Sequence, residues 1–448
     1  MEFMMAFAWS SVMLLLGVVL RAKVAFLQNM LVPSSVIAGV LGIIFMNIAE
    51  GTGISVGTTT ATFTGIVNHL FTISFISITL IKAPEGSGNT TKTIFNGIVG
   101  LGVIWSLLYG LTPILGSGII YLTGQSVDMD PIYGMLIQFA FCQGPGQSVT
   151  YGTLFETFGW PNSVTVAVAL SVIGFIMAFA IGIPIAKWGI KKGLAKHCGK
   201  IDEAILKGYL KKEEQTAMMV KDTTCNSNIE TLTYHFAIIG LCYLMAVGLS
   251  IIFSYIPGFL GVTLSGMMFA NGIYSALILK YVMAKVKLDF MLENTLQTKI
   301  TSWTSDYLVV SAFMAVSVSI IINWIVPILV LAVLTTAVTF FVCFYFGRRL
   351  GGTNDFERTL GMYASCTGTI PCGISVVRII DPNFKTSTAI ELGACNVVMF
   401  VSTPVYLIIL AYASGTIDLW TTIGSLFLCC IAYMVVLKVN KNWGPRSF

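Results

Sequence analysis

Two short segments, 141–152 and 365–373, interrupt apolar stretches with glycine, proline and small polar residues. A broken helix exposes N–H groups at one end of the break and carbonyl groups at the other. The N–H groups attract an anion, because the positive end of the helix dipole lies behind them. Carbonyl and hydroxyl oxygens suit Na⁺. The pattern therefore predicts a site for a small anion and a coupled cation, and ordinary kinks at helix contacts are the alternative.

Eight residues near the interruptions are candidate substrate ligands, because they offer N–H groups, side-chain donors or a positive charge. They are Gly144, Gly146, Gln147, Ser148, Thr367, Gly368, Thr369 and Arg378. Pro371 suits the first turn of a helix, where its missing N–H costs nothing. Arg378 could clamp a carboxylate through two parallel hydrogen bonds, or extend to the cytoplasmic interface instead.

Five further residues are candidate cation ligands, because they place oxygen or sulfur atoms in or beside apolar segments. They are Thr150, Cys366, Glu391, Asn396 and Asp306. A carboxylate as deep as Glu391 requires a partner, and Lys385, Arg378 or a bound cation would serve. Asp306 could equally cap a helix at the membrane interface.

The composition indicates that lipid is the solvent of this chain. Charged residues make up 10% of the 448 residues, apolar residues make up 56%, and the mean hydropathy is +0.86. A typical soluble domain is about 25% charged. The apolar runs are long and do not alternate, so they predict spanning helices and not a β-barrel. The ten cysteines show no metal-ligand spacing, and we expect free thiols without disulfides.

Eleven hydrophobic segments predict membrane-spanning helices, while the interrupted segments at 131–158 and 359–380 are expected to enter and leave on the same side. The predicted spans are 4–20, 33–49, 61–82, 92–122, 161–186, 235–255, 258–284, 303–322, 324–347, 385–413 and 418–437. With the N-terminus outside and the C-terminus cytoplasmic, all 25 Lys and Arg residues fall on the cytoplasmic side, as the positive-inside rule requires. If either interrupted segment spanned once, clusters of lysine would lie outside. This topology explains the net charge of +5, so nucleic-acid binding is not expected.

The two halves of the chain share a repeated pattern. An offset of 224 relates identical pairs: Pro33 and Pro257, Gly42 and Gly266, Cys142 and Cys366, Gly144 and Gly368. Because five helices are an odd number, the second half starts on the opposite side, which gives an inverted repeat. The expected division is 1–186, a Lys-rich cytoplasmic linker at 187–234, a second half at 235–413, and a further helix and tail at 414–448. The predicted fold is an all-α polytopic membrane protein with two inverted five-helix repeats, each with a re-entrant Gly-rich hairpin, plus one extra C-terminal helix.

These features resemble the bacterial sodium:glutamate symporter (ESS) family. The likeness covers most of the chain and is best at 144–155, 264–272 and 366–374. It implies Na⁺-coupled uptake of an acidic amino acid by an elevator-like movement, in a homodimer in the bacterial inner membrane. The chain departs from the family at 143–147, which reads Gln-Gly-Pro-Gly-Gln where paired glycines, His and Thr are typical. It also departs at Arg378 and in the extra C-terminal helix.

Taken together, the residues predict a Na⁺-coupled secondary symporter for a small organic anion, with glutamate or a related acidic amino acid as the first candidate. The alternatives are a transporter of another carboxylate, a cation or proton antiporter, and a channel or sensor. An antiporter usually needs a buried acidic pair, which the interruptions lack. No P-loop, HExxH or Ser–His–Asp pattern is found, so we expect no enzyme activity and no cofactor. The expected partners are a small anion, Na⁺, lipid and a second copy of the chain.

Overall fold

The computed structural model describes residues 1–448 except 30–31, 82–91, 199–205, 211–221, 226, 352–353 and 383. Over these described residues the chain is helical and has no β-strand, which confirms the predicted all-α fold class. The α-helices are α1 (Glu2–Lys23), α2 (Ala25–Asn29), α3 (Ser34–Thr52), α4 (Thr60–Leu80), α5 (Lys92–Thr123), α6 (Ile137–Phe141), α7 (Pro145–Thr157), α8 (Ser163–Lys191), α10 (Thr231–Ser254), α11 (Phe259–Gly266), α12 (Met268–Lys285), α13 (Asn294–Met314), α14 (Val318–Ile321), α15 (Ile325–Gly347), α16 (Asp355–Thr367), α17 (Ile370–Ile380), α18 (Thr388–Val398), α19 (Thr403–Ala413) and α20 (Leu419–Val439). Short 3₁₀ helices are η2 (Gln125–Val127), η3 (Pro131–Leu136), η5 (Asp289–Met291), η6 (Ile322–Trp324) and η7 (Met399–Ser402).

Within the described part of the chain, eight helical stretches are long and apolar enough to cross a membrane, so the protein is a multi-pass membrane protein. They are α1, α3, α4, α5, α8, α10, α20 and the stretch from α14 through α15. Helices α11 and α12 would form a ninth span, with a bend of 66° where they join. The two other predicted spans, 303–322 and 385–413, coincide with helices that are more polar or are broken.

The structure corrects the boundaries of these two spans. Helix α13 begins well before 303, because the Glu293 carboxylate caps it by accepting from the Thr295 N–H (3.3 Å). Most residues of this first part, 294–302, are polar, which hides it from a hydropathy reading. The helix then ends at Met314, so one continuous helix over 303–322 is wrong. The stretch 385–413 divides into α18, η7 and α19, and Pro404 lies in the first turn of α19, where proline is tolerated.

The chain forms two compact units, and each is assembled from separate segments. The first unit contains 1–15, 38–88 and 210–315, and the second contains 16–37, 89–209 and 316–448. Each unit takes segments from both halves of the sequence, so this division by contact is different in kind from the predicted division into repeats. Much of the predicted linker lies outside the described residues.

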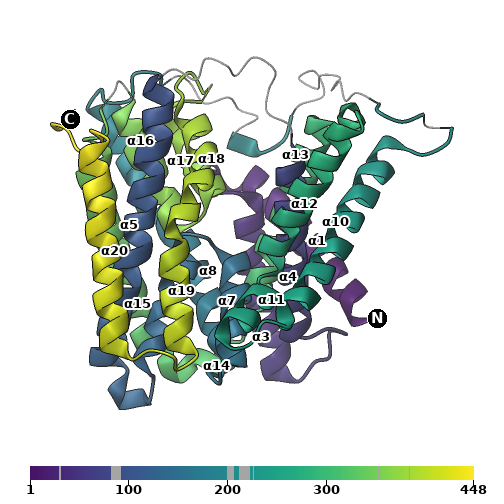
Figure 1. The fold of residues 1–448 in the computed structure, drawn as a ribbon, viewed down its shortest axis with the longest axis horizontal. Helices are drawn as coiled ribbons and strands as arrows, with labels where there is room; N and C mark the ends of the chain where they lie inside the picture. The colour runs from purple at the N-terminus through teal and green to yellow at the C-terminus, as the bar shows by residue number, and fades with distance from the viewer. Residues whose placement is uncertain are drawn as a thin grey trace. The chain divides into compact units, whose positions relative to one another are not determined.

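In the first unit, α4 packs against both α12 and α13 (Figure 1). Gly272 brings α12 close to α4, because a Cβ there would lie 2.9 Å from Ile76 Cγ1. The buried Ser77 hydroxyl donates to the side-chain oxygen of Gln297 (2.6 Å) and so joins α4 to α13. Small residues and interhelical hydrogen bonds are the usual means by which helices pack in lipid.

In the second unit, the long helix α5 packs against α15, α18 and α20 (Figure 1). Two glycines on α5 permit close approach, Gly110 toward α20 and Gly116 toward η3. A Cβ at Gly110 would lie 2.7 Å from Cys430 Sγ, and one at Gly116 would lie 2.0 Å from the Gly134 carbonyl oxygen. Helix α8 packs against α7, α16 and α17. These contacts gather both interrupted segments in one unit.

Candidate functional site

The two interruptions predicted from the sequence lie in contact within the second unit. The first separates α6 from α7, and the second separates α16 from α17. The Cys142 thiol donates to the carbonyl oxygen of Cys366, with an Sγ–O distance of 3.6 Å. A Cβ added to Gly144 would lie 2.4 Å from Thr369 Cγ2 and 3.7 Å from the Gly368 carbonyl oxygen. Residues from distant parts of the sequence therefore meet at one place.

The local sequence explains both breaks. Gly144 has φ 77° and ψ −166°, a backbone region that is open almost only to glycine. Pro371 lies in the first turn of α17, where no hydrogen bond is lost. Gly174 allows α8 to approach the second break, because a Cβ there would lie 2.3 Å from the Thr367 carbonyl oxygen. The α16 side of the second break is thus covered by α8.

The predicted hydroxyl ligands of the first interruption are buried and bonded to their own helix. Ser148 Oγ donates to the carbonyl oxygen of Gly144, and Thr150 Oγ1 donates to that of Gly146, both at 3.1 Å. A hydroxyl that donates in this way keeps lone pairs with which it can accept or coordinate. Both residues therefore remain able to act as ligands.

The second interruption shows the same pattern. Thr367 Oγ1 donates to the Tyr363 carbonyl oxygen (2.8 Å). Thr369 Oγ1 and Cys372 Sγ are 3.6 Å apart at the start of α17. Thr367 and Cys366 are fully buried, whereas Thr369 is partly exposed. A ligand would therefore approach the polar groups of this break from the side of Thr369.

Four aromatic residues that sequence reasoning did not single out surround the first interruption. The rings of Phe139 and Tyr151 stack with centroids 3.8 Å apart, and Tyr406 of α19 stacks on Tyr151 at 5.8 Å. Tyr109 of α5 meets Tyr406 edge-on at 5.1 Å and donates its hydroxyl to the side-chain oxygen of the buried Gln147 (3.3 Å). The sequence offers no signal that separates these rings from ordinary core aromatics. The three tyrosines add phenol hydroxyls to the polar groups of the break.

The buried carboxylate of Glu391 is paired with Arg358, and not with the expected Lys385 or Arg378. Arg358 Nε donates to Glu391 Oε2 and Nη2 donates to Oε1, each at 2.6 Å, which is a bidentate ion pair. The side chains of Arg358 and Glu391 are 1% and 0% exposed. The sequence reading missed Arg358 because it counted this residue among the cytoplasmic basic residues.

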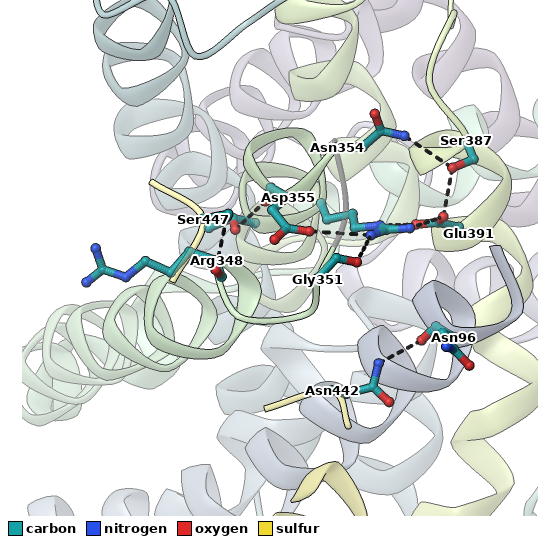
Figure 2. A network of polar contacts seen from close by, with 11 residues as sticks. Asn96, Arg348, Gly351, Asn354, Asp355, Ser387, Glu391, Asn442 and Ser447 are labelled. Carbon is teal, nitrogen blue, oxygen red and sulfur yellow. Dashed lines mark hydrogen bonds and ion pairs between the residues drawn. The ribbon is translucent and has the colours of Figure 1, made fainter. Parts of the chain in front are cut away.

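Further polar groups complete this pair (Figure 2). The Ser387 hydroxyl donates to Glu391 Oε1 (2.8 Å). Arg358 Nη1 donates to the Gly351 carbonyl oxygen (3.2 Å) and lies 3.4 Å from an Asp355 carboxylate oxygen. The network joins α16 to α18 by charge-assisted hydrogen bonds in a buried place.

Three predicted site residues lie elsewhere. Arg378 is exposed near the end of α17, and its guanidinium carbon lies 4.9 Å from the ring centroid of Phe384. Asp306 is exposed on α13, in the first unit. Asn396 belongs to α18, but its side chain is outside the described part of the structure.

The comparisons with known proteins identify the family. A family model described as Sodium/glutamate symporter matches residues 1–385, which is well over half of the chain. The match includes both interruptions and Arg358 and ends before Glu391. A search of curated proteins finds no match. The helical fold, the apolar spans and this extensive match agree, and the chain belongs to the sodium/glutamate symporter family.

Proposed function

We propose that this protein is a Na⁺-coupled secondary symporter that takes up glutamate or a related acidic amino acid. Membership of the sodium/glutamate symporter family indicates a transporter, and it supports Na⁺ as the coupling ion. The contact between the two interruptions supports a binding site at particular residues. It joins Cys142 to Cys366 and Gly144 to Thr369.

The proposed substrate site uses the first turns of α7 and α17. These helices have 13 and 11 residues, so each carries a partial positive charge at its N-terminal end. In the described structure no side chain caps either helix at Gly144 or Thr369. The first N–H groups are therefore available to a carboxylate. Gly146, Gln147 and Ser148 would supply donors from α7.

The cation site is proposed beside the same breaks. The Thr150 and Thr367 hydroxyls keep lone pairs that suit Na⁺, and the carbonyl oxygens near Cys366 belong to the last turn of α16. Asn396 and Asp306 stay candidate cation ligands. Arg378 stays a candidate substrate ligand that would act from the far end of α17, about 12 Å from its first turn.

Alternating access is proposed to follow from an inverted repeat. The contact between Cys142 and Cys366 joins positions 224 apart, which is the offset that relates the repeated motifs. Residues related by a two-fold axis touch only at the axis, so this contact supports a pseudo-axis through the interruptions. An elevator-like movement with re-entrant hairpins, an external N-terminus, and a homodimer in the bacterial inner membrane belong to the same proposal.

Another carboxylate is the alternative substrate, and a cation or proton antiporter is the alternative mechanism. Antiporters usually bind their ions with buried acidic groups. Glu391 is such a group, but both of its oxygens accept hydrogen bonds from Arg358. The pairing therefore favours symport.

Uptake into proteoliposomes tests the proposal. We expect radiolabelled glutamate to accumulate when the Na⁺ gradient is directed inward, and to equilibrate without accumulation when Na⁺ is equal on both sides. Accumulation that is independent of the gradient would exclude symport. If glutamate is not transported, but another carboxylate raises the melting temperature of the purified protein in Na⁺, then only the substrate changes.

A further inference from the structure

We propose that Arg358 and Glu391 form a positioning pair, which holds α16 in the orientation that the interruption at its far end requires. The inference rests on the proposed transport function. It gives Glu391 a role different from the cation ligand that is expected from the sequence. It also assigns a role to Arg358, which the sequence analysis counted only among the cytoplasmic basic residues.

The pair acts at one end of the helix that carries the second interruption. Arg358 lies in the first turn of α16, and Glu391 lies in the first turn of α18. The break after Thr367 is about 14 Å further along α16. A rotation or slide of α16 at the pair would therefore displace Thr367 and Gly368, which are proposed ligands.

The other contacts of α16 are apolar packing and neutral hydrogen bonds, such as the one from the Tyr363 hydroxyl to the Met177 carbonyl oxygen of α8 (3.0 Å). Gly361 packs against Leu392 of α18 and Val377 of α17, and the Phe356 ring packs against Gly189 of α8. Apolar contacts of this kind are not directional. The bidentate guanidinium–carboxylate pair, in contrast, fixes both the distance and the relative plane of the two groups. The ion pair is therefore the charged, directional contact that holds the first turn of α16.

The surroundings are fitted to the ion pair. Gly97 on α5 leaves the space that the carboxylate fills, because a Cβ there would lie 2.5 Å from Glu391 Cδ and 2.6 Å from Oε2. Ser387 and Arg358 direct three donors at the two carboxylate oxygens, and a further nitrogen of Arg358 reaches the Gly351 carbonyl (Figure 2). These oxygens are engaged by protein donors, so a positioning role suits Glu391 better than cation ligation.

Five variants separate positioning from simple stabilisation. Arg358→Met and Glu391→Met each leave one buried charge without its partner, which is strongly destabilising. The double variant with both methionines removes both charges of the pair, and it is made together with Asp355→Asn, because the buried Asp355 carboxylate also faces Arg358 (3.4 Å) and would otherwise lose its cation. Replacements that leave no unpaired buried charge are often neutral for stability. Arg358→Lys keeps the charge but loses the bidentate geometry. Arg349→Gln is the control, because Arg349 lies just beyond the end of α15 and its side chain donates to the Tyr345 carbonyl oxygen of that helix (2.6 Å).

The measurements are the melting temperature, the glutamate Kd in saturating Na⁺, the Na⁺ half-saturation, and the KM and maximal rate of uptake. We expect the double variant to melt near the wild-type temperature and still bind glutamate roughly tenfold or more weakly, because the ligands are displaced. Arg358→Lys should show the same weakening, and Arg349→Gln should match the wild type.

Three results would overturn the inference. A stable double variant with the wild-type Kd would make the pair merely structural, and a wild-type Kd for Arg358→Lys would do the same if the double variant fails to fold. A change in Na⁺ half-saturation with Glu391→Met alone, and not with Arg358→Met, would make Glu391 a cation ligand. The proposed function itself would be overturned if the wild-type protein showed no Na⁺-dependent glutamate binding and uptake. This result is obtained before any variant is compared, so it is distinct from a failure of the inference.

Discussion

Single residues at the interruptions act through small size, backbone conformation and neutral hydrogen bonds. Gly144 has a positive φ and lies against Thr369 of the other break. Gln147 is held by the Tyr109 hydroxyl in a buried place. Each of these features depends on one or two atoms. A substitution that adds or removes a single methyl or hydroxyl group should therefore alter transport.

Gly144→Ala should abolish most uptake. The new Cβ would lie 2.4 Å from Thr369 Cγ2, in a backbone region that alanine avoids at a cost of about 1–3 kcal/mol. Gly159→Ala is the control, since Gly159 also has a positive φ (98°) but has no atom near its Cβ position. Adding Thr369→Ser to Gly144→Ala removes the obstructing methyl group and should restore part of the uptake. Equal losses in both alanine variants would show that strain alone is responsible.

Tyr109→Phe should raise the KM for the substrate about two- to tenfold, because it removes one neutral hydrogen bond worth about 0.5–1.5 kcal/mol. The maximal rate of uptake should change less. The matched control is Tyr307→Phe, which removes a hydroxyl that lies 2.9 Å from the Ser11 hydroxyl within the first unit, whereas both breaks belong to the second unit. A similar KM in the two variants would contradict a role for Gln147 in the site.

Helices of the second unit approach one another closely where glycines face backbone atoms. Gly174 of α8 lies against the Thr367 carbonyl of α16, so the two helices meet at the break itself. Backbone atoms cannot move aside as a flexible side chain can. The position of the second interruption therefore depends on a neighbouring helix as well as on its own sequence.

Gly174→Ala should lower stability by about 1–3 kcal/mol through overpacking and should weaken substrate binding. Gly248→Ala on α10 is the comparison, because a Cβ there meets no atom within 4 Å and alanine favours the helix by up to about 1 kcal/mol. Thermal unfolding in detergent measures both. If the Gly174 variant were as stable as the Gly248 variant, the close approach of α8 to the break would not matter.

The topology of the whole molecule can be tested with its own cysteines. In the described structure Cys198 and Cys225 are exposed, and both lie in the linker that is predicted to be cytoplasmic. An impermeant maleimide should label them in inside-out vesicles and spare them in right-side-out vesicles. Labelling from the outside would reverse the proposed orientation.

The pH at which maleimide begins to label Cys225 is a separate prediction. The Ser227 hydroxyl, 3.1 Å from Cys225 Sγ, and a Ser227 backbone hydrogen bond hold the pKa of Cys225 below its usual value. The thiolate is the reactive form, so Cys225 should react at a lower pH than an ordinary thiol and lose this reactivity as the pH falls through its pKa. Ser227→Ala should move the onset of labelling of Cys225 to higher pH, and an unchanged onset would exclude the hydrogen bond as the cause.

The sequence by itself determined those properties that add up over neighbouring residues. Hydropathy is such a sum, and it identified the lipid solvent, the all-helical class and most of the spans. Turn chemistry is also local, so Gly144 and Pro371 marked both breaks correctly. The same reading failed at α13, where polar residues in the first turns of a helix lowered the sum.

Only the tertiary structure decided which distant groups meet. The contact of Cys142 with Cys366, the hydrogen bond from Tyr109 to Gln147, and the pairing of Arg358 with Glu391 each join different helices. Such pairings depend on how helices rotate and approach, which is set by the packing of many small residues together. No local pattern records that outcome, which is why Glu391 was expected to pair with Lys385 or Arg378 and is found beside Arg358.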